Sequence, residues 1–359
     1  MESGRELDGL SAPPSPWRGG ILGFLSRHPV VFLLALSPGI PEYLSGSSPI
    51  SALVTNPGQF VFQLVLNLGL YGPGVLLIRE ARVRWQKGWP TVLLLGAAYA
   101  ILEEGVALST MFNPDSQVVV SSGLGTYGHW LGVSWIWVEG IILVHVLFSI
   151  STPILLLDLA LPSTKEKPFL AGRRLAAAGT ILCLDVSSLF GLVYFGQKFY
   201  MGNAVLAGSL LSICLLVYLA RKAPSGSPLP DGRSPSFGLV KTGVVGVFAY
   251  VGILLIEGVT SKTSAILTFA LVLGYEAAYL WWITSRLNFA GNERHLLAFT
   301  LGAVLPLFPF GLISQFPIDI VVIADAGLLL LYRQLFRVYP AGRGELPTQQ
   351  QVENLSAAT

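Results

Sequence analysis

Two adjacent acidic residues, Glu103 and Glu104, lie in a long apolar stretch and are the residues best suited to carry chemistry. Neighbours on a helix point about 100° apart, so both side chains cannot face lipid. A charged group at the centre of a membrane helix costs about 2.5–3.5 kcal/mol on the insertion scale, and such groups face protein or water. The pair therefore predicts a buried functional site.

His145 lies in the next apolar stretch, at a comparable depth. With a rise of 1.5 Å per residue, the glutamate pair lies about 13 Å and His145 about 18 Å below the outer ends of their helices. His145 also shares a helix face with Ser149, four residues later. Because two neighbouring carboxylates do not readily ionise together, one can act as a general base on water. The pattern predicts hydrolysis, and the alternative for each residue is a structural hydrogen bond between helices.

A second pattern indicates transport. Ser37-Pro38-Gly39-Ile40-Pro41-Glu42 cannot form a regular helix, because each proline removes a donor and clashes with the preceding turn. Breaks are also expected at Tyr71–Gly74 and Pro306–Gly311. Transporters use broken helices and intramembrane carboxylates to bind ions and substrates. The candidate substrate- or ion-binding residues are Glu42, Asn67, Glu139, Ser149 and Glu276, which favour a proton- or cation-coupled transporter as the alternative function.

The composition identifies the elements that must position these residues. The 359-residue chain is 53% hydrophobic and only 12% charged, against about 25% charged residues in soluble domains. We predict an all-α, polytopic transmembrane helix bundle with about ten spans. The spans are expected near Pro29–Leu44, Gln59–Ile78, Pro90–Phe112, Val133–Leu159, Leu175–Gly196, Met201–Ala220, Gly238–Glu257, Ser264–Thr284, Leu296–Ile313 and Pro317–Leu335.

Charge indicates the orientation of these spans. All but two of the 22 basic residues, Lys198 and Lys262, lie on the side that also holds both termini, and cytoplasmic loops retain Lys and Arg. We therefore expect cytoplasmic termini, disordered tails at 1–28 and 336–359, and a transmembrane domain at 29–335. Ten of the 20 acidic residues fall within or at the ends of spans, and three near span ends are expected to be solvated: Asp158, Glu257 and Asp319.

The residues around the glutamate pair resemble the CPBP family of glutamic intramembrane proteases, which includes CAAX-processing endopeptidases. That family carries EExxxR, then FxxxH, then HxxxN. Glu103 and Glu104 match the pair, and His145 matches the histidine of the second motif. Leu108 and Ile141 replace the Arg and the Phe, and the later His295 is followed by Phe299 in place of Asn. The resemblance covers residues 91–162 and implies that the carboxylates activate water.

The sequence also indicates which partners to expect and which not to expect. A net charge of +2 gives no reason to expect nucleic acid. No zinc-spaced His/Cys set, phosphate loop or HExxH is present, so we expect neither metal nor cofactor. We expect membrane lipid as the environment, a prokaryotic plasma membrane as the location, and a membrane peptide or small solute as the substrate. A noncatalytic membrane scaffold is a further alternative.

Overall fold

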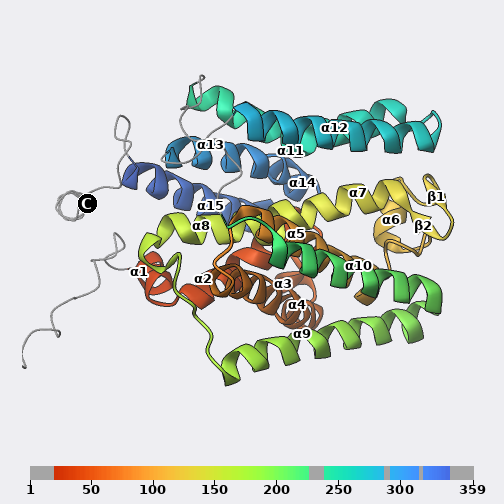
Figure 1. Ribbon diagram of the computed structural model, residues 1–359, viewed down its shortest axis with the longest axis horizontal. Helices are drawn as coiled ribbons and strands as arrows, with labels where there is room; N and C mark the ends of the chain where they lie inside the picture. Colours follow the sequence, from red (N-terminus) through yellow and green to blue (C-terminus); the bar gives the residue numbers. More distant parts are fainter. Residues whose placement is uncertain (1–19, 226–237, 287–291, 315–317, 340–359) are drawn as a thin grey trace, which may run out of the picture.

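The computed structural model describes residues 20–225, 238–286, 292–314 and 318–339, and these form a helical bundle with one very short hairpin (Figure 1). Eight helices are long and apolar enough to cross a membrane. They are α4 (Pro57–Arg84), α5 with η2 (Trp89–Ala100, Ile101–Ala107), α7 with η3 and α8 (Trp135–Val144, His145–Ser151, Thr152–Ala160), α9 with η5 (Arg173–Leu192, Val193–Gln197), α10 (Asn203–Lys222), α11 (Leu239–Thr260), α12 (Ala265–Arg286), and α13 with α14 (Glu293–Val304, Leu307–Ser314).

The other two predicted spans are also helical. The first is a shorter apolar helix, α2 with η1 (Pro29–Pro38, Gly39–Leu44), and the second is α15 (Ile318–Val338). Helix α1 (Gly20–Arg27) lies within the predicted N-terminal tail, and α15 continues three residues beyond the predicted boundary at 335. The remaining short elements are α3 (Ala52–Thr55), α6 (Gln117–Ser121), β1 (His129–Trp130) paired antiparallel with β2 (Val133–Ser134), and η4 (Pro162–Thr164).

Three helices change from α to π geometry at the residues that sequence analysis identified. The π-helical turn η1 contains Glu42, η2 contains Glu103 and Glu104, and η3 begins at His145. A π turn widens the helix and often marks a functional site. The predicted break of the first span is confirmed, because its α geometry ends at Pro38.

The predicted break at Tyr71–Gly74 is wrong, since α4 runs without interruption from Pro57 to Arg84. Packing explains the continuity. A Cβ on Gly72 would meet the Leu34 side chain, and a Cβ on Gly74 would meet the Tyr99 ring. The two glycines thus give neighbouring helices room to approach, and those contacts hold α4 straight through Pro73. The break near Pro306 is confirmed, because α13 ends at Val304 and α14 begins at Leu307.

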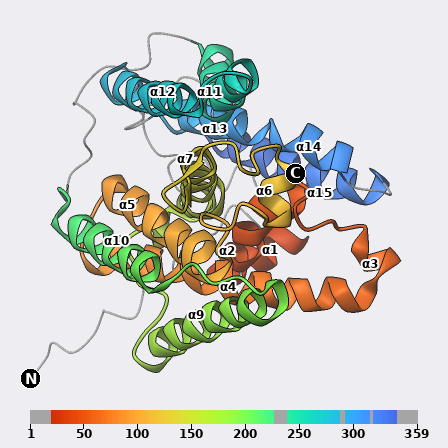
Figure 2. The same ribbon diagram turned by 90° about the vertical axis from the view of Figure 1, so that its right-hand side faces the viewer.

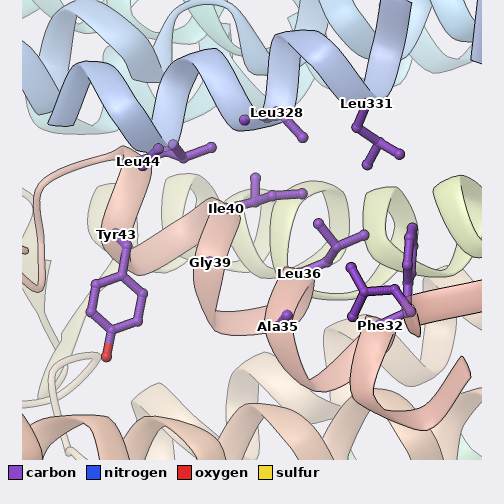
Figure 3. Close-up of a pocket in the computed structure, with 12 residues that line it drawn as sticks. Phe32, Ala35, Leu36, Gly39, Ile40, Tyr43, Leu44, Leu328 and Leu331 are labelled. Carbon is purple, nitrogen blue, oxygen red and sulfur yellow. The ribbon is translucent and has the colours of Figure 1, made fainter. Parts of the chain in front are cut away.

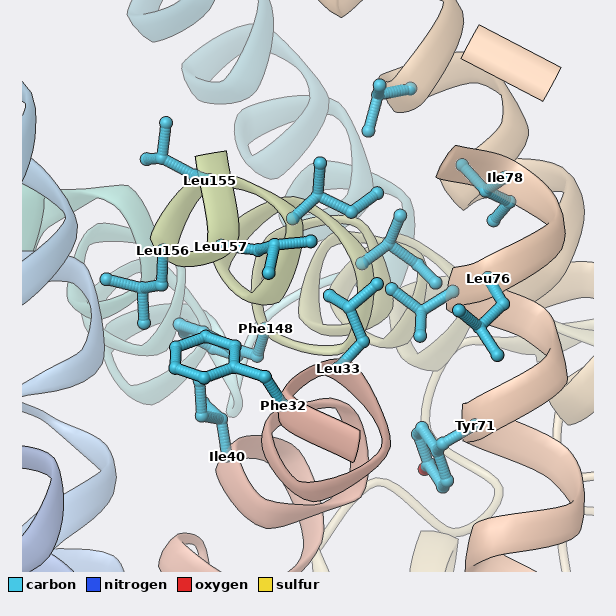
Figure 4. Packing of buried hydrophobic residues seen from close by; sticks show 14 of the residues in the cluster. Phe32, Leu33, Ile40, Tyr71, Leu76, Ile78, Phe148, Leu155, Leu156 and Leu157 are labelled. Atoms are coloured by element: carbon cyan, nitrogen blue, oxygen red, sulfur yellow. The ribbon is translucent and has the colours of Figure 1, made fainter. Parts of the chain in front are cut away.

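The helix formed by α7, η3 and α8 runs through the middle of the bundle (Figures 1 and 2). Every residue of α8 is buried. Its apolar side chains pack with residues from α2 and α4 into the cluster drawn in Figure 4, and the result is a rigid frame around the η3 turn. The labelled members are Phe32, Leu33, Ile40, Tyr71, Leu76, Ile78, Phe148, Leu155, Leu156 and Leu157.

Asp158 differs from its expected solvated state. Its side chain is buried, and Oδ2 accepts a hydrogen bond of 2.7 Å from the Arg82 guanidinium. The Asp158 carboxylate is stable near the end of α8 because Arg82 of α4 supplies the opposite charge. Glu257 is half-buried, and the side chain of Asp319 lies outside the described residues.

Glycines bring α11 and α13 into backbone contact. A Cβ on Gly302 would meet the carbonyl oxygen of Gly243, and a Cβ on Gly246 would meet that of Phe299. Membrane helices pack closely through such small residues because lipid offers no hydrophobic driving force between helices.

We therefore predict that Gly246→Ala destabilises the protein by about 1–3 kcal/mol, since the added methyl must push α13 away. Gly258→Ala on the same helix is the matched control, because a Cβ there meets nothing within 4 Å. It should leave the stability unchanged or raise it by at most about 1 kcal/mol. Thermal unfolding of the detergent-solubilised protein measures both. An equal effect of the two variants would contradict the close contact.

Candidate functional site: a buried Glu-Glu-His cluster

Helices α5 and α7 meet at their π turns and bring Glu103, Glu104 and His145 together. The Nδ1 atom of His145 lies 3.2 Å from Glu103 Oε2, and its Nε2 atom lies 3.2 Å from Glu104 Oε1. The exposed fractions of the three residues are 1%, 7% and 2%. The prediction that the pair and the histidine lie at one level is confirmed. One imidazole therefore bridges two carboxylates in a site closed to solvent.

Hydrogen bonds from the surrounding residues orient this cluster. Ser149, one turn after His145, places its hydroxyl 3.0 Å from Nδ1, as their shared helix face predicts. The Thr110 hydroxyl donates to Glu104 Oε2 and accepts a 3.0 Å bond from the indole of Trp137. His145 and Glu104 are thus each oriented by a hydroxyl group from a residue outside the cluster.

Two tyrosine rings enclose the imidazole. Tyr71 stacks on His145 with 6.1 Å between ring centroids, and Tyr99 meets it edge-on at 6.0 Å. The Tyr99 side chain interacts electrostatically with Glu103, one turn further along the same helix. Its hydroxyl is buried, and the Glu103 carboxylate is the one acceptor beside it among the described residues. A hydroxyl donor therefore lies next to the cluster.

Tyr71 connects the cluster to Glu42. Its hydroxyl donates a 2.6 Å hydrogen bond to Glu42 Oε1, while Glu42 Oε2 accepts one of 2.7 Å from Ser48. The Ser48 hydroxyl in turn accepts from the side-chain amides of Gln63 and Asn67, at 2.8 and 3.0 Å. Glu42 and Asn67 thus belong to one polar group that adjoins the Glu-Glu-His cluster through a single tyrosine.

The remaining candidates, Glu139 of α7 and Glu276 of α12, lie outside this cluster. Together with Glu257 of α11 they form a separate acidic group. Both carboxylate oxygens of Glu139 are buried without a hydrogen-bond partner among the described residues.

A cavity of about 280 Å³ lies on the other side of η1, between α2 and α15 (Figure 3). Its wall is apolar and includes Phe32, Ile40 and Leu328. The cavity and the polar site lie on different sides of the η1 turn. Tyr43 of η1 lines the cavity, whereas its neighbour Glu42 accepts the hydrogen bond from Tyr71. It is not the place where the charged side chains converge.

Sequence analysis missed the residues that complete the site. Tyr99 could have been found, since it precedes Glu103 by four residues and therefore shares its helix face. Tyr71 and Thr110 could not, because their roles depend on how α4 and the loop after η2 fold back on the cluster.

The fold and the site define a multi-pass integral membrane protein with an intramembrane Glu-Glu-His cluster. A family model described as an uncharacterized membrane protein family matches residues 31–324, and the chain belongs to that family. The matched range includes every residue of the cluster. It is not the model of the CPBP family, so catalysis stays a prediction. No curated protein and no solved structure matches the chain.

Thr110→Val tests how the cluster is held. The variant leaves Glu104 Oε2 and the Trp137 indole without their partner, and an unsatisfied buried polar group costs about 1–3 kcal/mol. Ser212→Ala, which removes an exposed hydroxyl bonded only to its own helix, should change stability by less than about 0.5 kcal/mol. The measurement is thermal unfolding. A Thr110→Val protein as stable as the control would contradict the arrangement.

Proposed function

We propose that the protein is an intramembrane hydrolase that cleaves peptide bonds of membrane segments with Glu103, Glu104 and His145. The single observation that carries the proposal is the contact of both imidazole nitrogens with the two carboxylates, at 3.2 Å each. Catalytic bases and their orienting partners lie within such distances. The partial resemblance to the CPBP glutamic proteases supports the same reaction class.

The reaction follows from the chemistry of these groups. One carboxylate removes a proton from water, and the water oxygen attacks the carbonyl carbon of the peptide bond. The oxyanion that forms needs a hydrogen-bond donor, and the Tyr99 hydroxyl is available beside Glu103. The proton then passes to the leaving nitrogen as the C–N bond breaks. Tyr99 would thereby serve in place of the Asn that the CPBP pattern has in its third motif.

The test uses purified full-length protein in liposomes with a library of membrane-spanning peptides. We expect cleavage by the wild type and a loss of at least about 100-fold in Glu103→Gln, Glu104→Gln and His145→Ala, since removing a general base or acid has that effect. Glu139→Gln is the matched control, because this glutamate is equally embedded but lies outside the cluster. Absence of cleavage by the wild type, or equal loss in the control, would overturn the proposal.

The second candidate is proton- or cation-coupled transport, favoured by the hydrogen bond between Tyr71 and Glu42. This bond and those of Ser48 join Glu42 and Asn67 to the Glu-Glu-His cluster through polar side chains from three segments. Carboxylate chains of this kind carry protons in pumps and transporters.

Transport is tested in the same liposomes with an imposed pH gradient and a pH-sensitive dye inside. This function predicts proton flux in the wild type and at least about a ten-fold reduction in Tyr71→Phe, because the phenyl ring cannot bond Glu42. Proton flux without peptide cleavage would favour transport over hydrolysis. Neither activity would favour a membrane scaffold.

A further inference from the structure

We propose that Glu103, Glu104 and His145 bind one divalent transition-metal ion. One ligand atom from each of the three side chains lies within 4.8 Å of the others, and all three residues are buried. Ligands of a tetrahedral ion with bonds of about 2.0–2.2 Å lie about 3.3–3.6 Å apart. Side-chain movements of about 1.2 Å therefore bring the three ligand atoms around one ion.

The charges of the site favour a bound cation. Among the described residues, His145 is the sole ion-pair partner of Glu103 and Glu104. Even a protonated imidazole balances only one of two carboxylates. A divalent ion with a neutral imidazole balances both, which matters because an uncompensated charge is expensive inside a membrane.

The surrounding hydrogen bonds are those expected around metal ligands. A ligating histidine usually donates its other ring N–H to an oxygen, and a ligating carboxylate is itself hydrogen-bonded. With Nε2 as the ligand beside Glu104 Oε1, the Nδ1–H can donate to Ser149 or to Glu103 Oε2. Thr110 binds the second oxygen of Glu104. His145 and Glu104 therefore already have orienting partners.

The Tyr99 hydroxyl gives an independent indication. It is buried beside the Glu103 carboxylate and has no other hydrogen-bond partner among the described residues. Three protein ligands leave a coordination position for water, and a water there would accept a hydrogen bond from Tyr99. The nitrogen ligand favours ions such as Zn²⁺ over Mg²⁺ or Ca²⁺, whose ligands are oxygens.

The ligands come from two helices, and Glu104 and His145 are 41 residues apart in the chain. No short metal-binding motif therefore marks them in the sequence. The expectation of a metal-free protein was based on the absence of such motifs. The inference does not depend on the proposed hydrolase activity, because ion binding is measured without substrate.

The experiment measures Zn²⁺ and Mn²⁺ in untagged, full-length protein after gel filtration in detergent, by mass spectrometry of the metal and by titration of the chelator-treated protein. We expect about one ion per chain, no competition by equimolar Mg²⁺, and loss of the ion in Glu104→Gln and His145→Ala. Glu139→Gln is the control and should keep the ion, because its carboxylate lies in the separate acidic group.

Ser149→Ala covers the case in which the ligand variants fail to fold. It removes only an orienting hydroxyl, and it should weaken Zn²⁺ binding about 10–100-fold. Co²⁺ added to the wild type should give visible absorption bands that Zn²⁺ abolishes. A metal-free wild type that takes up no ion, or equal binding by Glu104→Gln and the wild type, overturns the inference. A wild type that takes up no ion and still cleaves peptides would overturn the inference while leaving the hydrolase proposal intact.

Discussion

The structure depends on one interaction: at the centre of the bundle, buried carboxylates pair with a basic side chain from another helix. Glu103 and Glu104 pair with a single imidazole that contacts one carboxylate through each nitrogen. Asp158 pairs with Arg82 near the other end of α4. Because water is absent at that depth, these pairs fix how α4, α5 and the central helix lie against one another, and the apolar cluster around α8 fills the space between them.

The π turns are the local means by which the chain makes this interaction. In an α-helix, Glu103 and Glu104 would point about 100° apart, and only one would face the central helix. In the wider π turn of η2 both carboxylates reach the same imidazole, which itself stands at the start of the π turn η3. Glu42 occupies a third π turn, and two prolines next to it prevent the regular α-helical pattern of hydrogen bonds. Three of the four π turns in the described residues thus coincide with a glutamate or a histidine, and the fourth, η5, holds neither.

The sequence predicts the helices well and the site only in part. Apolar length locates all ten helical stretches, and helical rise places His145 level with the glutamate pair, because both depend on local geometry alone. The continuity of α4 was missed, since it depends on Leu34 and Tyr99 filling the space beside two glycines. Tyr71 and Thr110 were missed for the same reason, and the grouping of Glu276 with Glu139 and Glu257 was not predicted because it depends on how α7, α11 and α12 face one another.

The backbone contact between α11 and α13 has a mechanical consequence. Two helices whose backbones touch at Gly243 and Gly302, with no side chain between them, cannot slide or tilt independently. Helix α13 also contacts α15, and α15 contacts η1, the turn that holds Glu42. Helix α11, at one edge of the bundle, is therefore connected by a continuous series of helix contacts to the polar group that adjoins the histidine, although no residue of α11 belongs to that group.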